Sequence, residues 1–331
     1  MQVQNVHSKL EQVAHSDESI LDALDELSNI DGLRNSFTII FQWGVILISA
    51  GVSIVLNTWW AYTISIFIIA SRQHALGVLF HEASHYRLYR QRWINDLISD
   101  LFCALPSGII TSRYRFEHLR HHAAPNTDSD PYWRVFQRNP FCWRWPKKPS
   151  QAALVLIRDV LGINTPRALL EFWPWFPWAN HFGSSALPPP LSIRDRFITY
   201  FFFSAVLFSL FYLNAWLEFL LLWVLPLSTV TQLLLRIRAI SEHFGLEAPS
   251  GPDATRHIDA SCLEGLAISP LNINYHLAHH MFPNVTWYNL PKLNQMLFSN
   301  QEFSANAHRT PSYLGSHGVL RHELTIAESL P

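Results

Sequence analysis

Four long apolar runs divide the chain, and each is long enough to cross the hydrocarbon core of a membrane. They cover residues 37–56, 59–80, 197–213 and 215–235. A bilayer core about 30 Å thick requires a helix of about 20 apolar residues. The polar breaks near residues 57 and 214 leave room only for turns, so the runs form two pairs. The pattern predicts an all-α integral membrane protein with four transmembrane helices in two pairs.

Basic residues follow the second and the fourth run, at residues 86–92 and at Arg236 and Arg238. Cytoplasmic flanks of membrane spans carry an excess of Lys and Arg. The first residues lack the short basic and then apolar pattern of a cleaved signal peptide. We therefore expect a multi-pass protein whose termini both lie in the cytoplasm, together with the segment between the second and third runs and the segment after the fourth run.

Shorter patterns lie between and before these runs. An amphipathic surface helix is expected at residues 20–30, with Asp17 or Ser19 as its cap, because its apolar residues recur at helical spacing. Residues 93–105 are too short and too polar to span a membrane, which favours an interfacial or re-entrant helix ending at Pro106. Residues 131–195 are rich in Trp, Pro and Arg and are expected to be loop-like.

Two interpretations of residues 131–195 stay open, a membrane-surface aromatic belt and a substrate portal. In the fourth run, Pro226 is expected to kink the helix. The whole pattern divides the chain into a polar N-terminal segment (1–36), a membrane domain (37–295) and a C-terminal tail (296–331).

Composition agrees with a membrane protein and excludes other classes. The 331 residues are 49% hydrophobic and 14% aromatic, and the formal net charge is −1. A charge near zero without a basic tract argues against a nucleic-acid partner. The three cysteines are widely spaced, so neither a disulfide framework nor a Cys-x-x-Cys site is predicted.

The candidate chemistry lies in histidines, which follow the second and the fourth apolar run and recur elsewhere in tight groups. Residues three and four apart lie on one face of a helix, so an HxxxH or HxxHH string directs several imidazoles toward one point. Neutral imidazole is the commonest metal ligand in proteins. The proposed ligands are His81, His85, His118, His121, His122, His243, His276, His279 and His280.

Nine imidazoles exceed what one ion can hold, so the set predicts two metal ions. Structural zinc usually takes four ligands, often including Cys, and fits this set poorly. Imidazole itself suits iron, copper, zinc and nickel. His308, His317 and His322 share no ligand spacing and are interpreted as surface residues.

These strings resemble the three histidine boxes of the membrane fatty acid desaturase and hydroxylase superfamily. The matching strings are His81-x-x-x-His85, His118-x-x-His121-His122 and Asn272-x-x-x-His276-x-x-His279-His280. The paired spans and the isolated His243 after the last span also match. The resemblance extends over about residues 37–295.

The resemblance implies two Fe²⁺ ions in a cytoplasmic helical cap above a four-span bundle, with dioxygen as co-substrate. No catalytic residue is expected beyond the metal centre. Asn272 is implied to contact the metal through water, and Glu82, Asp130 and Glu242 lie beside the boxes, where they can orient the imidazoles.

The resemblance further implies an oxidoreductase of fatty acid and lipid metabolism, a desaturase that places a double bond in a fatty acyl or lipid chain. No nucleotide, haem or iron–sulfur motif is present, so electrons are expected from a ferredoxin or a small haem protein with its reductase. Arg236, Arg238 and Arg256 are candidates for holding a polar head group or the donor, or else for ion pairing. Other possibilities are a hydroxylase or ketolase of a lipid or carotenoid, a desaturase of a smaller amphiphile, and a non-enzymatic metal-binding membrane protein.

Overall fold

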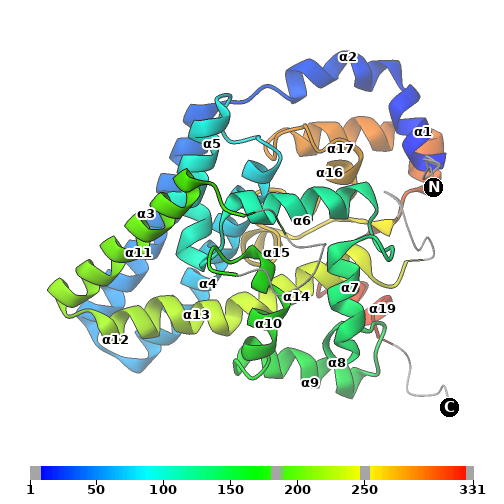
Figure 1. Cartoon of the computed structure of the whole chain (residues 1–331). Coiled ribbons are helices and arrows are strands. Elements are labelled where there is room, and N and C mark those ends of the chain that lie inside the picture. Colours follow the sequence, from blue (N-terminus) through cyan, green and yellow to red (C-terminus); the bar gives the residue numbers. More distant parts are fainter. Residues whose placement is uncertain (1–8, 180–187, 189, 247–253, 326–331) are drawn as a thin grey trace. The chain divides into compact units, whose positions relative to one another are not determined.

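The structure is a computed structural model that describes residues 9–179, 188, 190–246 and 254–325. The first eight residues of the predicted N-terminal segment and the last six of the predicted tail lie outside this range. The chain forms two compact units, each built from segments far apart in sequence (Figure 1). We call Met1–Asn29, His118–Ala152 and Ile237–Pro331 the histidine unit, and Ile30–Glu117 and Ala153–Arg236 the span unit.

Four helical stretches are long and apolar enough to cross a membrane, which confirms the mostly helical fold and the prediction of four membrane-capable helices. They are α3 (Gly32–Leu56), α4 (Trp59–Ser84), α11 (Ile193–Leu213) and the interrupted stretch Trp216–His243. The second stretch runs four residues past the predicted end at residue 80, and the fourth runs eight past residue 235. Both extensions reach histidines of the predicted ligand set.

Within each predicted pair of spans, an asparagine makes the turn. Asn57 ends α3 and Asn214 ends α11, both with positive φ, at 45° and 51°. A left-handed residue stops a helix, and Asn tolerates this conformation better than most residues. Next to the first turn, the hydroxyls of Ser53 and Ser65 lie 2.6 Å apart, and Ser65 also donates to the Ser49 carbonyl. These small residues let α3 and α4 pack closely.

The fourth stretch is irregular around Pro226, where a kink is predicted. It consists of α12 (Trp216–Phe219), the π-helix η4 (Leu220–Val224), α13 (Leu225–Ser228) and α14 (Val230–His243). Thr229 interrupts it with φ −127° and ψ −91°. Proline removes a backbone donor and clashes with the preceding turn, which accounts for irregular geometry on both sides of it.

Residues 92–123 form a bent pair of helical stretches. The first contains α5 (Arg92–Ser99), the π-helix η1 (Asp100–Ala104) and the 3₁₀ helix η2 (Leu105–Ser107), and the second is α6 (Thr111–Ala123). They meet at an angle of 87°. Gly108 makes the turn with φ 79°, a value that few other residues adopt readily. A helix ending near Pro106 agrees with the predicted interfacial or re-entrant segment.

The expectation that residues 131–195 are loop-like is wrong for most of the segment. It contains α7 (Pro131–Arg138), α8 (Pro140–Trp143), α9 (Pro149–Val160), α10 (Thr165–Glu171) and the 3₁₀ helix η3 (Trp173–Trp175). Three of these helices begin at a proline, which fits the first helical position because its missing N–H would have no partner there. Asp130 and Asn139 cap the first two with their side chains.

The histidine unit contains the N-terminal and C-terminal segments as well as the third histidine string. Its further elements are α1 (Lys9–Ser16), α2 (Glu18–Leu27), β1 (His257–Ile258), α15 (Cys262–Ala267), α16 (His276–Met281), α17 (Leu290–Ser299), α18 (Gln301–Asn306), β2 (Arg309–Thr310) and α19 (Val319–His322). β1 and β2 pair in parallel.

The predicted amphipathic helix near residue 20 exists and is capped by Asp17, as expected. Its apolar face is not left at a surface, however. Ile20 and Leu27 are buried in one hydrophobic core with Leu277 and Met281 of α16. Burying such side chains stabilises a fold by about 1.5–3 kcal/mol each, so α1 and α2 support the helix that carries the third histidine string.

Candidate metal centre

Seven of the nine predicted ligands lie in the histidine unit, on α6, α14 and α16. The last two turns of α6 present His118, His121 and His122, and α16 presents another three. His243 is the last residue of α14. The ligand strings therefore lie on helices, as their spacing predicts.

Four of these side chains come together in one cluster: His121, His243, His276 and His280. One ring nitrogen from each lies within 4.8 Å of those of the other three, and all four residues are buried. The Nε2 atoms of His276 and His243 are 2.9 Å apart, and those of His280 and His276 are 3.1 Å apart.

Such distances fit nitrogens that share one ion. With metal–nitrogen bonds of about 2.1 Å, two ligand nitrogens lie about 3.0 Å apart at a right angle and about 3.4 Å apart at the tetrahedral angle. Burial and the neighbouring imidazoles lower the pKa of His280 well below its usual value. A neutral ring keeps the lone pair that a metal needs. The donor set of this cluster therefore fits a transition-metal ion.

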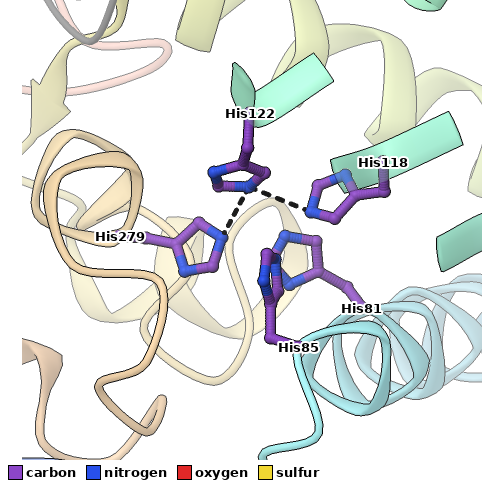
Figure 2. Close-up of side chains that lie close together, drawn as sticks. All are labelled: His81, His85, His118, His122 and His279. Carbon is purple, nitrogen blue, oxygen red and sulfur yellow. Dashed lines mark hydrogen bonds between the residues drawn. The ribbon is translucent and has the colours of Figure 1, made fainter. Parts of the chain in front are cut away.

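A second group in the histidine unit consists of His118, His122 and His279. Figure 2 shows these rings with dashed lines that join His122 to the other two. The His122 Nε2 atom lies 3.1 Å from that of His118 and 3.2 Å from that of His279. The rings of His122 and His280 stack at 4.1 Å, so the two groups of imidazoles are direct neighbours.

His81 and His85 belong to the span unit. Figure 2 also draws both rings at the end of the α4 ribbon. Both residues are buried, and their ring centroids are 5.3 Å apart, as expected for residues one turn apart. The Nδ1 atom of His81 lies 3.4 Å from a carboxylate oxygen of Glu82.

Asp130, which lies beside the second string in sequence, contacts His121. Its Oδ2 is 2.9 Å from the His121 Nδ1 and accepts from the Asn126 backbone N–H, also at 2.9 Å. Its Oδ1 accepts from the Tyr132 N–H. Hydrogen bonding to Nδ1 fixes the tautomer of a ligand histidine and leaves Nε2 with the lone pair.

Two contacts near the second string were not predicted from the sequence. The Tyr132 hydroxyl lies 3.3 Å from the His118 Nδ1, and the Asn126 side chain donates to the His243 carbonyl at 3.0 Å. Both residues flank Asp130 in the loop and helix start that follow α6. The only available signal is their closeness to a histidine string, and many residues share it.

Glu242 and Asn272, two further expected neighbours of the boxes, each contact another residue of the histidine unit. Glu242 accepts a 2.7 Å hydrogen bond from the Arg238 guanidinium, and its second oxygen lies 3.5 Å from the His276 Nε2. The Asn272 side-chain amide donates to the Trp287 carbonyl at 3.2 Å. Asn272 has φ 61° and stands in the turn before α16.

The three candidate head-group arginines are all in ion pairs within their own units. Arg236 pairs with the fully buried Asp159, Arg238 with Glu242, and Arg256 with Glu323. A buried guanidinium needs a carboxylate close by to offset the loss of its hydration. Of the two interpretations of these arginines, the contacts favour ion pairing.

Comparison with known proteins places the chain among desaturases. A family model described as fatty acid desaturase matches residues 57–311. A dihydrorhizobitoxine desaturase of Bradyrhizobium elkanii is 25% identical over 242 residues, which are 71% of this chain and 67% of that protein. An acyl-lipid (9-3)-desaturase of Physcomitrium patens is 23% identical over 293 residues, 81% of this chain. The match spans about half, 52%, of the latter protein's length.

Proposed function

Because the chain belongs to the fatty acid desaturase family, we propose that it is a membrane-bound, di-iron, dioxygen-dependent oxidoreductase that introduces a double bond into a fatty acyl or lipid chain. The observation that supports this most is the buried cluster of His121, His243, His276 and His280. Four converging imidazoles form a ligand set that suits iron.

A second ion requires the remaining five histidines. His118, His122 and His279 supply three adjacent imidazoles, and we propose that His81 and His85 supply the other two. Helix α6 runs without a break from the span unit into the histidine unit, so His118 follows directly on the membrane-associated part of the chain.

When bound, the iron pair supplies the oxidising power of dioxygen to an unactivated C–H bond. The overall reaction takes one hydrogen from each of two adjacent carbons, together with dioxygen, two electrons and two protons, and yields an alkene and two waters. The residues of this chain hold and orient the imidazoles. Asp130 holds His121 through Nδ1, and Glu242 and Glu82 lie next to His276 and His81. Asn272 is proposed to contact the metal through water.

The membrane and an external electron donor complete the proposal. The four long helices span the membrane, and we propose that the histidine strings and both termini lie in the cytoplasm. There, a ferredoxin or a small haem protein with its reductase supplies electrons. The substrate enters from the lipid phase, which accords with the large exposed apolar side chains on α3 and α11.

The experiment that tests the function is a lipid profile by mass spectrometry of a host that expresses the chain. We expect products two hydrogens lighter than the host lipids, and none from a variant with His276→Ala. Products that gain an oxygen instead would make the chain a hydroxylase or ketolase. No change in either direction, with the protein present in the membrane, would contradict an enzyme acting on lipids.

A smaller amphiphile is the second candidate substrate. The relative in Bradyrhizobium elkanii is named as a desaturase of dihydrorhizobitoxine, and the match covers 67% of that protein. Supplying the host with saturated, water-soluble amphiphiles, and analysing the medium as well as the lipids, separates the two substrate classes.

A further inference from the structure

Several side chains of the histidine unit meet at the carboxylate of Glu323 in the C-terminal segment. β2 pairs with β1 through hydrogen bonds from the His257 N–H to the His308 carbonyl and from the Asp259 N–H to the Thr310 carbonyl, both at 2.9 Å. The side chains of His308 and Thr310 then both contact the carboxylate of Glu323, with the His308 Nε2 at 2.8 Å. Strand pairing therefore places two polar groups around Glu323.

The same carboxylate holds the fully buried Arg256. The Arg256 Nη2 lies 3.0 Å from the Glu323 Oε2 and donates to the backbone carbonyl of Phe244. Burial lowers the pKa of Arg256 to about 10, which leaves the guanidinium protonated at neutral pH. A charged group in this position depends on its carboxylate partner.

Phe244 directly follows His243 at the end of α14. The last carbonyls of a helix have no partner within the helix and must be satisfied from outside. Here Asn126 donates to the His243 carbonyl at 3.0 Å, and Arg256 donates to the next one. A cation at a helix C-terminus is also favourable toward the helix dipole.

Gly245 shows how closely the C-terminal segment approaches this helix end. Its φ is +69°, and a Cβ added there would lie 3.0 Å from the backbone carbonyl oxygen of Glu323 and 3.2 Å from a methyl carbon of Leu324. Both the conformation and the space favour glycine. The backbone after His243 is therefore held on one side by Arg256 and on the other by the chain around Glu323.

We propose that Glu323 and Arg256 are positioning residues for the metal ligand His243, so that the C-terminal segment is part of the metal site. The inference rests on the proposed function. His243 has no second histidine on its own helix turn, unlike the ligands on α6 and α16. Its direction depends on how the end of α14 is held, and Arg256, paired with Glu323, holds the Phe244 carbonyl there.

Removing the Glu323 carboxylate leaves Arg256 buried without its charge partner and frees it to leave the Phe244 carbonyl. His243 then loses its fixed direction, while the ligands on α6 and α16 keep theirs. Outer contacts of this kind change metal affinity by about 10–100-fold. We expect a loss of that size at one of the two ions and little change at the other.

The test titrates the purified, metal-free full-length chain with Co²⁺ and follows the absorption spectrum. The variants are Glu323→Gln, Glu323→Ala and Arg256→Lys. The matched control is Glu26→Gln, which removes a carboxylate from the exposed 2.7 Å pair with Lys292 in the same unit. We expect two ions at unchanged affinity in the control, and one of the two weakened in each variant.

A double variant separates positioning from general damage. If Glu323 acts through His243, adding Glu323→Gln to His243→Ala weakens Co²⁺ binding no further than His243→Ala alone. Unchanged affinity in both Glu323 variants would overturn the proposal, and so would equal weakening of both ions or full additivity. Glu323→Gln keeps the side-chain shape and decides the matter if the alanine variant does not fold. Two bound ions without any desaturated product would instead contradict the proposed function alone.

Discussion

Replacing Asp130 by Asn separates two roles that this side chain combines. Its Oδ1 caps α7 by accepting from the Tyr132 N–H, and its Oδ2 accepts from the Asn126 N–H and lies 2.9 Å from the His121 Nδ1. Asn caps helices about as well as Asp, so the cap survives if the amide oxygen takes the Oδ1 position. The amide NH₂ then takes the position of Oδ2, where it faces the Asn126 N–H and the His121 Nδ1–H, which are both donors.

The expected magnitude follows from this geometry. With an NH₂ group facing its Nδ1, the His121 ring favours the tautomer with the proton on Nε2, which removes the lone pair that binds the metal. Loss of such an outer contact costs about 10–100-fold in metal affinity or activity, equivalent to about 1.4–2.8 kcal/mol. The alternative amide orientation spares His121 and sacrifices the cap, at a cost of about 1 kcal/mol of folding stability.

The assay measures iron content, desaturated product and thermal unfolding at equal expression. Asp128→Asn is the control, because Asp128 is exposed in the same loop. We expect Asp130→Asn to lose iron affinity and product with little change in the unfolding temperature. Normal iron affinity and product in this variant would refute the idea that Asp130 sets the state of His121.

Three further predictions test the site and its setting. Metal analysis of protein made with iron supplementation is expected to find about two irons per chain, and one tightly held zinc without iron-dependent activity would contradict this. Cysteines introduced in place of Asn57 and Arg120 are expected to react with an impermeant reagent from outside only at position 57; the opposite labelling would reverse the proposed topology. His243→Ala is expected to lower iron content and abolish turnover with the spans still folded, whereas His317→Ala, at an exposed position, changes neither. Near-normal product from His243→Ala would remove His243 from the proposed ligand set and leave eight histidines in it.

The parts of the fold that follow from local patterns could be predicted. Apolar run length sets a membrane helix, and helical spacing within a histidine string sets a shared direction, so four spans and the histidines on α6 and α16 follow from neighbours in sequence. Asp130 is a candidate because it lies beside the second histidine string. Except for the spans, each of these predictions depends on residues fewer than ten positions from one another in sequence.

Helices that begin at proline were missed because the same residue ends helices and starts them. The richness of residues 131–195 in Trp, Pro and Arg predicts a loop, yet Pro131 and Pro140 both take the first helical position after a capping Asp or Asn. A capping Asp or Asn directly before a proline is the sequence signal for the start of a helix. For Ile20 and Leu27 the helix was predicted correctly, but its packing partner on α16 lies about 250 residues away and leaves no local trace.

Contacts between residues far apart in sequence are hardest to predict for charged residues. Arg256 and Glu323 are 67 positions apart, and neither stands near a histidine string, so composition alone cannot tell a surface charge from a buried pair. What distinguishes them is burial: a guanidinium with no exposed surface must have its carboxylate within reach, and here that carboxylate comes from the segment expected to be a tail. Folding thus joins two remote charges at the end of α14, next to the one proposed ligand that no local motif orients.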